Sequence, residues 1–309
     1  MRRTLSVALA ALALPAVAQQ THTFKTIDEL PIQADVWRPA GEGVRPVILW
    51  IHGGALIGGH RGNLRSDQRQ RYLEAGFTVV SIDYRLAPET KLAHILEDVS
   101  DAYRWIRAEG PKLFGADPAR IGVVGHSAGG YLTLTCGYRL KPRPRALVSF
   151  YGYGDIAADW YSRPDPFYSQ QPAVPKDEAY QSVGSTPLSG APGSNRRFRF
   201  YLYCRQQGLW PKEVAGFDPH TQPKAFDPLC PARNVTPDYP PTLLLHGDND
   251  TDVPFAQSEE MAREFERRGV EHEFIRVPGG PHGFDSRMKD PSVAATFERV
   301  IAFLKKRLE

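Results

Sequence analysis

A serine flanked by glycines, placed between a strand-like and a helix-like segment, constrains this chain more than any other feature. The pentapeptide Gly125-His126-Ser127-Ala128-Gly129 follows the β-branched run at residues 121–124 and precedes residues 130–138, which contain few helix breakers. A serine on such a turn takes a strained backbone conformation, and the glycines let neighbouring chain pass without a Cβ clash. The sequence therefore predicts a nucleophilic Ser127 at the carboxyl edge of a sheet, beside a helix N-terminus.

A serine is a weak nucleophile unless a base and an orienting carboxylate assist it, and the C-terminal part of the chain supplies both. Residues 242–247 predict another buried strand, which Asp248, Asp250 and Asp252 follow. His282 lies in a glycine-rich loop after a later strand-like segment. Because serine, acid and histidine occur in this order, we expect His282 to be the base, whereas most other histidines are expected at the surface or in the core.

The segment around the three aspartates resembles a known family. His246-Gly247-x-x-Asp250-x-x-Val253-Pro254, followed by Gln257-Ser258, is similar to the acid loop of the prolyl-oligopeptidase-like and esterase branches of the α/β-hydrolase superfamily. The resemblance implies that Asp250 is the catalytic acid. Asp252 and Asp248 are the alternatives, and we expect them to cap their own loop or to face solvent.

A tetrahedral intermediate also needs preorganised N–H donors, an oxyanion hole. The apolar segment at 46–51 leads into His52-Gly53-Gly54-Ala55, which resembles the His-Gly-Gly-Gly motif of hormone-sensitive-lipase-like esterases. The resemblance implies donors at Gly54 and Ala55, beside the N–H of Ala128. Ala55 replaces a third glycine, and alanine tolerates positive φ poorly, so the choice among the three residues after His52 stays open.

A further segment, Asp83-Tyr84-Arg85-Leu86-Ala87-Pro88-Glu89, is similar to a structural segment of the same esterase branch. There an aspartate–arginine pair braces the loop near the serine, so we expect these residues to support the site. Together the similar motifs run from about residue 45 to 284, whereas residues 153–236 match none of them.

Strand and helix signals alternate along the chain after an N-terminal hairpin turned at Glu29-Leu30-Pro31. We expect strands near residues 21–26, 32–37, 47–51, 78–83, 121–125 and 146–150, and helices near 67–75, 94–107 and 130–138. This order predicts an α/β-hydrolase fold, a mostly parallel central sheet with helices on both faces. The proline- and aromatic-rich residues at about 153–236 are expected to form a cap-like insertion over the serine, in which most aromatics pack the insertion's own core. Arg196-Arg197-Phe198-Arg199 is either a solvated helix face or part of an anionic substrate site.

Composition limits the function classes. The 309 residues, 41% hydrophobic and 24% charged, fit one globular α/β domain, although length alone would also allow two. The net charge of +3, to which Arg2 and Arg3 contribute, gives no electrostatic case for nucleic-acid binding. The apolar run at 5–16 is too short to span a bilayer, and Ala16-Val17-Ala18 matches a signal-peptidase site. We therefore expect a signal peptide at 1–18 and a periplasmic or secreted single domain at 19–309; an N-terminal anchor or a disordered tail is the alternative.

The three cysteines are compatible with such a compartment. Cys136 is expected to be a buried free thiol on the helix after Ser127, whereas Cys204 and Cys230 could pair, which the sequence leaves open.

These features predict a serine esterase that cleaves small-molecule carboxylic esters through an acyl-enzyme, with Ser127, His282 and Asp250 as the triad. We expect no cofactor, no metal, no nucleic-acid partner and no stable membrane span. The acyl chain, the alcohol and the oligomeric state stay open. A serine peptidase or amidase of the prolyl-oligopeptidase-like type is the alternative, and a non-catalytic binding protein of the same fold, which usually lacks a triad member, is a third.

Overall fold

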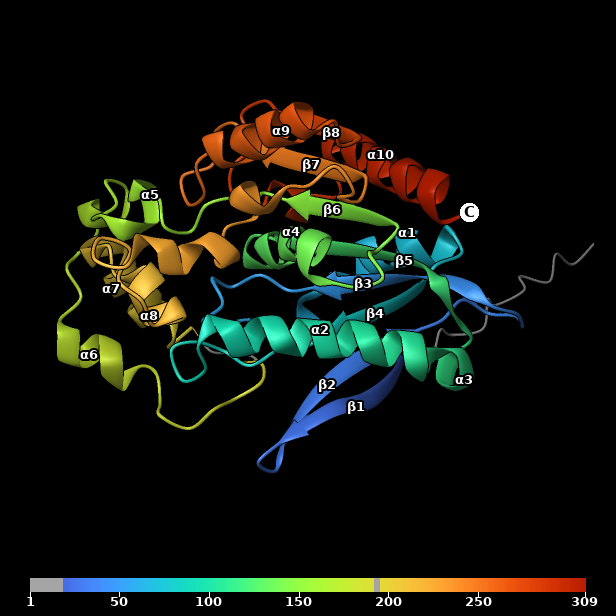
Figure 1. Ribbon diagram of the computed structural model, residues 1–309, viewed down its shortest axis with the longest axis horizontal. Coiled ribbons are helices and arrows are strands. Elements are labelled where there is room, and N and C mark those ends of the chain that lie inside the picture. The colour runs from blue at the N-terminus through green and yellow to red at the C-terminus, as the bar shows by residue number, and fades with distance from the viewer. Residues whose placement is uncertain (1–18, 192–194) are drawn as a thin grey trace, which may run out of the picture.

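The computed structural model describes residues 19–191 and 195–309, and the predicted signal peptide at 1–18 lies outside the described residues (Figure 1). One eight-stranded sheet has the order β1-β2-β4-β3-β5-β6-β7-β8. The strands are β1 Gln19–Ile27, β2 Leu30–Trp37, β3 Arg45–Ile51, β4 Thr78–Ile82, β5 Ala116–His126, β6 Ala146–Phe150, β7 Thr242–Gly247 and β8 His272–Val277. β2 pairs antiparallel with both β1 and β4. The other six strands, β4, β3, β5, β6, β7 and β8 in spatial order, are parallel to one another. The predicted mostly parallel sheet is confirmed.

Helices cover both faces of the sheet, because each face carries its own set of buried apolar side chains. On one face α2 (Leu92–Ala108), α4 (Ala128–Arg139) and α9 (Ala256–Arg268) enclose a core that includes Leu96, Leu132 and Phe265. On the other, α1 (Ser66–Glu74) and α10 (Pro291–Leu308) enclose a second core with Tyr72, Phe297 and Leu304. A short helix, α3 (Gly110–Phe114), precedes β5. With parallel strands between these layers, the loops at the strand carboxyl ends share one edge, where open α/β sheets bind ligands.

The N-terminal hairpin forms as predicted, but its turn is earlier than expected. Leu30 already pairs with Ile27, so the loop consists of Asp28 and Glu29, whose φ values are +45° and +69°. Two positive φ angles in a two-residue loop match the right-handed twist of the flanking strands.

The described residues between β6 and β7 form four helices beyond the carboxyl ends of the strands, at the left of Figure 1. These are α5 (Asp159–Ser162), α6 (Lys176–Gln181), α7 (Phe198–Gln207) and α8 (Trp210–Ala215), together with 3₁₀ turns at 168–170, 223–229 and 231–234. Tyr161 and Trp210 stack with ring centroids 4.0 Å apart and are both buried, so part of the aromatic content forms the core of this region.

One arginine ties this region to the sheet. Arg197 is buried and forms a bidentate ion pair with Glu89, at 2.8 and 2.6 Å, and its guanidinium also donates to the carbonyl of Ala87 at 2.7 Å. Arg196 and Arg199 are exposed. In this cluster Arg196 and Arg199 are therefore solvated, whereas Arg197 is buried with its charge neutralised by Glu89.

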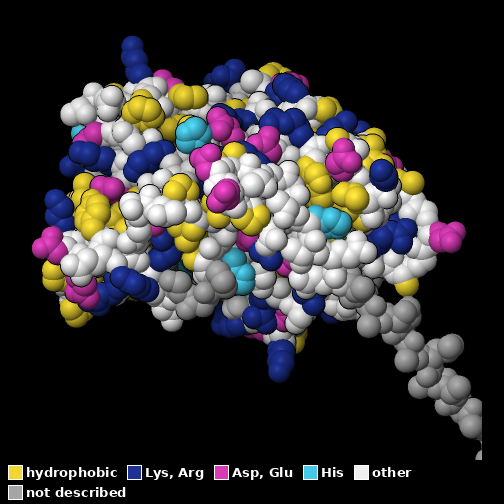
Figure 2. Space-filling model, turned by 90° about the horizontal axis from the view of Figure 1, so that it is seen from below, with side chains coloured by type: hydrophobic (Ala, Val, Ile, Leu, Met, Phe, Trp, Pro, Cys, Tyr) yellow, Lys and Arg dark blue, Asp and Glu magenta, His cyan; other side chains and the backbone are white. Residues whose placement is uncertain are grey.

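The remaining sequence expectations concern thiols and surfaces. Cys136, Cys204 and Cys230 are all buried free thiols, as expected for Cys136, and Cys204 and Cys230 do not pair. Acidic and basic side chains are interspersed over the face shown in Figure 2. Within residues 19–191 and 195–309, no helix has both the length and the apolar content to cross a bilayer.

Candidate active site

Ser127 lies on the turn between β5 and α4 in a strained conformation, with φ +56° and ψ −120°. The glycines on either side permit this turn. A Cβ at Gly125 would lie 2.1 Å from the carbonyl oxygen of Gly129, and a Cβ at Gly129 would lie 2.1 Å from that of Ile51. No side chain fits at either position without a backbone shift, which explains the Gly-x-Ser-x-Gly pattern.

His282 and Asp250 come from the loops after β8 and β7, and the structure brings them to Ser127. The His282 Nε2 atom lies 3.0 Å from Ser127 Oγ, and Nδ1 lies 2.7 Å from Asp250 Oδ2. Because a carboxylate only accepts, Nδ1 carries the proton and donates to Asp250, which leaves the Nε2 lone pair to accept from the serine hydroxyl. The three predicted triad residues thus form one hydrogen-bonded series.

The Asp250 carboxylate is fully buried, and both of its oxygens accept hydrogen bonds. Its Oδ1 accepts from the backbone N–H groups of Asp252 and Val253, both at 2.9 Å, so Asp250 itself caps the loop. His246 Nε2 lies 3.3 Å from Oδ2. Burial opposes ionisation, but the hydrogen bonds from His246 and His282 outweigh it and hold the pKa of Asp250 below its ordinary value.

His246 was a predicted motif residue without an assigned contact. Its Nδ1 accepts from the Ser258 hydroxyl at 2.7 Å, so Nε2 carries the proton and faces the Val253 carbonyl at 3.0 Å as well as Asp250. The motif's histidine and Ser258 therefore hold the acid loop in place, whereas the Gln257 side chain accepts from the backbone N–H of Asp155 at 3.0 Å.

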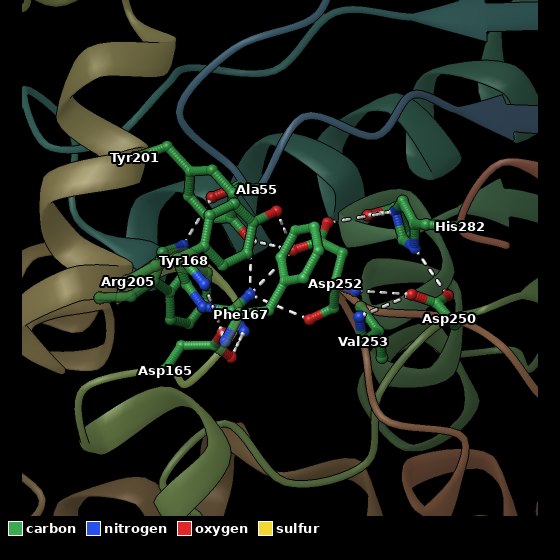
Figure 3. Close-up of polar contacts among 12 residues, drawn as sticks. Ala55, Asp165, Phe167, Tyr168, Tyr201, Arg205, Asp250, Asp252, Val253 and His282 are labelled. Atoms are coloured by element: carbon green, nitrogen blue, oxygen red, sulfur yellow. Dashed lines mark hydrogen bonds and ion pairs between the residues drawn. The ribbon is translucent and has the colours of Figure 1, made fainter. Parts of the chain in front are cut away.

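Asp252 differs from the expectation that it caps the loop or faces solvent. Its side chain points into the pocket, with Oδ2 3.4 Å from His282 Nε2 (Figure 3). Oδ1 accepts from the hydroxyls of Tyr168 at 3.0 Å and Tyr201 at 2.5 Å, and from Arg205 Nη1 at 2.8 Å. The expectation was wrong because these three donors come from the region that matched no motif.

Asp248, the other alternative acid, lies away from His282. Its carboxylate accepts from Arg276 Nε at 2.7 Å and from the backbone N–H of Gly279 at 2.6 Å. It joins the acid loop to the loop that carries the histidine.

Two carboxylates therefore face the two nitrogens of His282. Burial alone would lower the pKa of His282, but its hydrogen bond to Asp250 and the negative charge of Asp252 outweigh burial and raise this pKa above the ordinary histidine value. Only the neutral imidazole can accept a hydrogen bond from the serine hydroxyl, so the raised pKa moves the pH range in which this contact forms to higher values.

The glycine-rich loop after β3 lines the pocket beside Ser127. Gly54 and Ala55 both have positive φ, +107° and +55°, so alanine does adopt the conformation that favours glycine here. In the described part of the chain, neither backbone N–H donates to another protein group. Ala128, at the first position of α4, has no acceptor one turn earlier in the helix. All three expected donors are thus placed at or beside the pocket, and which of them bind an oxyanion stays a prediction.

Contacts from two directions hold this loop. The Tyr84 ring stacks on that of His52 with centroids 4.1 Å apart, and its hydroxyl donates to the His52 carbonyl at 3.0 Å. The Trp210 Nε1–H donates to the Ala55 carbonyl at 3.0 Å. Through these two contacts with His52, Tyr84 supports the site, as expected for its segment.

The expected pairing of Asp83 with Arg85 is not formed. Asp83 instead pairs with Arg61, and Arg85 forms a bidentate pair with the buried Asp98, with both contacts at 2.8 Å. The two side chains of the motif therefore anchor different neighbours, η1 (Arg61–Asn63) and α2.

A buried polar cluster that the sequence did not reveal lies behind His282. Asp285 accepts from the Tyr151 hydroxyl and from Gln68 Nε2, the latter at 2.6 Å, and the Tyr151 ring centroid is 4.6 Å from that of His282. Burial opposes ionisation, but nearby His126 and these hydrogen bonds lower the pKa of Asp285 to about 2. The cluster fixes the loop that carries the histidine.

A cavity of about 620 Å³ opens above the serine. Its wall combines the glycine-rich loop, the triad edge and residues between β6 and β7: Gly53, Gly54, Ala55, Ile57, Gly58, Gly59, His126, Ser127, Tyr151, Tyr168, Asn195, Arg197, Phe198, Tyr201, Asp252 and His282. This volume suits a small organic molecule.

Comparison with known families decides the assignment. The profile of the family described as α/β hydrolase fold matches residues 48–286, most of the chain. The chain belongs to the α/β-hydrolase family. The match runs from within β3 to the loop after β8 and so includes every site residue described above.

Solved structures agree with this fold. This α/β-hydrolase is 26% identical to an α/β-hydrolase superfamily protein from Enterococcus faecalis, with a TM-score of 0.74 over 94% of this chain and 100% of that one. It is 24% identical to carboxyl esterase 2 of Tuber melanosporum, with a TM-score of 0.68 over 98% and 95% of the two chains.

Similar curated sequences are much longer proteins. Non-reducing polyketide synthases of Stereocaulon alpinum and Preussia isomera are 29% and 30% identical over 87% and 88% of this chain. The chain spans only 12% and 14% of their lengths.

Proposed function

We propose that this α/β-hydrolase is a serine esterase that cleaves carboxylic esters through an acyl-enzyme. One observation carries the proposal: the hydrogen-bonded series from Ser127 Oγ through His282 to Asp250 at the wall of a cavity of about 620 Å³. The similarity to a carboxyl esterase supports ester cleavage as the reaction.

The reaction follows from the hydrogen bonds. Ser127 Oγ attacks the ester carbonyl carbon while its proton passes to His282 Nε2, and Asp250 stabilises the imidazolium that forms. The carbonyl oxygen becomes an oxyanion, for which the N–H groups of Gly54, Ala55 and Ala128 are the candidate donors.

Collapse of the tetrahedral intermediate breaks the bond to the alcohol oxygen, which takes the proton from His282 Nε2. The acyl group then remains on Ser127. Water attacks this acyl-enzyme with His282 as base, which releases the carboxylic acid and restores the serine hydroxyl.

The test compares Ser127→Ala with the wild type on propyl acetate and on a dipeptide anilide. We expect the variant to lose several orders of magnitude in ester turnover while its melting temperature stays within a few degrees of the wild type. Ser169→Ala, which changes an exposed serine between α5 and α6, is the matched control and should keep wild-type turnover. Ester hydrolysis by Ser127→Ala at the wild-type rate would refute the proposal, and preferential anilide cleavage by the wild type would favour the peptidase alternative.

A further inference from the structure

The two oxygens of the Asp252 carboxylate have different environments. Oδ1 accepts three hydrogen bonds, from Tyr168, Tyr201 and Arg205. Among the described residues, the polar neighbour of Oδ2 is His282 Nε2, at 3.4 Å. In the working state Nε2 carries no proton, so Oδ2 is an ionised acceptor in the pocket wall with no donor from these residues.

The position of Oδ2 defines which part of a substrate it meets. His282 Nε2 must reach the leaving alcohol oxygen, because it returns the proton to this atom. Since Oδ2 lies 3.4 Å from the same nitrogen, it borders the alcohol part of the ester. A hydroxyl on the carbon next to the one that carries the leaving oxygen would be within hydrogen-bonding reach of Oδ2.

We propose that Asp252 is a specificity-determining residue that accepts a hydrogen bond from a hydroxyl adjacent to the cleaved ester, so that the substrates are monoesters of vicinal diols such as polyols and sugars. The proposal rests on the proposed esterase function and deepens it.

Charge and shape at the pocket wall support this substrate class. The buried Arg205 is shared between Asp252 and Asp165, which are partly exposed, so these three side chains together carry a net negative charge. The guanidinium of Arg197 is neutralised by Glu89 and is not free to bind a carboxylate. These charges disfavour an anionic alcohol group.

The aromatic wall suits the apolar faces of a sugar or polyol chain. Tyr168 and Tyr201 line the cavity while their hydroxyls bind Asp252, and Phe198, 49% exposed, lies at the same wall. Flat apolar surfaces beside a charged acceptor match a ligand with C–H faces and hydroxyl edges.

The experiment uses two esters that differ by one group. 2-Hydroxyethyl acetate and propyl acetate are nearly isosteric, with a hydroxyl in place of a methyl, and their kcat/KM ratio reports recognition of that hydroxyl. The wild-type ratio is compared with the ratio of the alkaline hydrolysis rates, which corrects for leaving-group reactivity. It is also compared with the ratio in Asp252→Asn, which keeps an oxygen for the three donors at Oδ1.

We expect the wild-type ratio to exceed the alkaline ratio about tenfold and to fall by about tenfold in Asp252→Asn, because a charge-assisted hydrogen bond is lost. Asp177→Asn makes the same chemical change at an exposed aspartate of α6, away from the pocket, and should keep the wild-type ratio. Acetoxyacetate, whose alcohol group carries a carboxylate, should be a poorer substrate than propyl acetate for the wild type.

Equal ratios in the wild type and Asp252→Asn would overturn the proposal. If Asp252→Asn does not fold, the wild-type measurement is sufficient, because a wild-type ratio equal to the alkaline ratio would also overturn the proposal. Failure of the esterase function is a different result, because the wild type would then cleave neither ester in a Ser127-dependent manner.

Discussion

Asparagine substitutions at Asp250 and Asp252, made one at a time, distinguish the two carboxylates that face His282. In Asp250→Asn the backbone N–H groups of Asp252 and Val253 still require an oxygen at the Oδ1 position. The amide nitrogen must then occupy the Oδ2 position, 2.7 Å from His282 Nδ1. Because that nitrogen donates, the imidazole is held with its proton on Nε2 and cannot accept from Ser127.

We therefore expect Asp250→Asn to lower kcat by roughly three to four orders of magnitude, the usual cost of the wrong tautomer in such a triad. In Asp252→Asn, the donors at Oδ1 direct the new amide nitrogen toward Nε2 at the longer distance of 3.4 Å. There it competes only weakly with the serine hydroxyl, so we expect a loss of about tenfold or less on a simple ester.

The assay is initial-rate hydrolysis of propyl acetate, followed by titration of the released acid at a pH where His282 is neutral. Melting temperatures of both variants verify folding. A larger loss in Asp252→Asn than in Asp250→Asn would refute the assignment of the acid and place it two residues further along the loop.

The remaining predictions concern pH, folding and export. The acid limb of the kcat/KM profile should lie above pH 6.5, the ordinary histidine pKa. Asp252→Asn should move this limb to lower pH, because removal of the negative charge lowers the pKa of His282; a pH series of both proteins measures this. Gly129→Ala should lower the free energy of unfolding in urea by about 3 kcal/mol or more, because its Cβ would lie 2.1 Å from a β3 carbonyl oxygen. Gly58→Ala should cost less, since its Cβ would have no contact shorter than 3.9 Å. We propose that the exported protein begins at about Gln19, and mass spectrometry of protein exported by the native host would contradict this if Met1 were retained.

The central sheet and the loops that carry Ser127, Asp250 and His282 were predictable because their signals are local. Buried parallel strands occur as apolar runs, as at β6 and β7, whose bounds match the prediction. The spacing of His246, Asp250 and Val253 also defines a loop whose hydrogen bonds close within a few residues. α9 was not predicted, although it directly follows this loop.

The substrate side of the site could not be predicted, because it depends on contacts between distant segments. Asp252 faces the pocket only because Arg205, 47 residues earlier, and the tyrosines at 168 and 201 bind it. Glu89 likewise meets Arg197 across 108 residues. Such partners carry no spacing signal in one sequence, and the region that supplies them matched no motif.

Covalent labelling of Ser127 tests the central claim most directly. The wild type is incubated with a fluorophosphonate, residual activity on propyl acetate is followed, and the modified peptide is identified by mass spectrometry. The account predicts one phosphonyl group per chain, on Ser127, with loss of activity in proportion to labelling, and no labelling of Ser127→Ala. Modification of a different residue, or full ester turnover by a chain phosphonylated at Ser127, would contradict it.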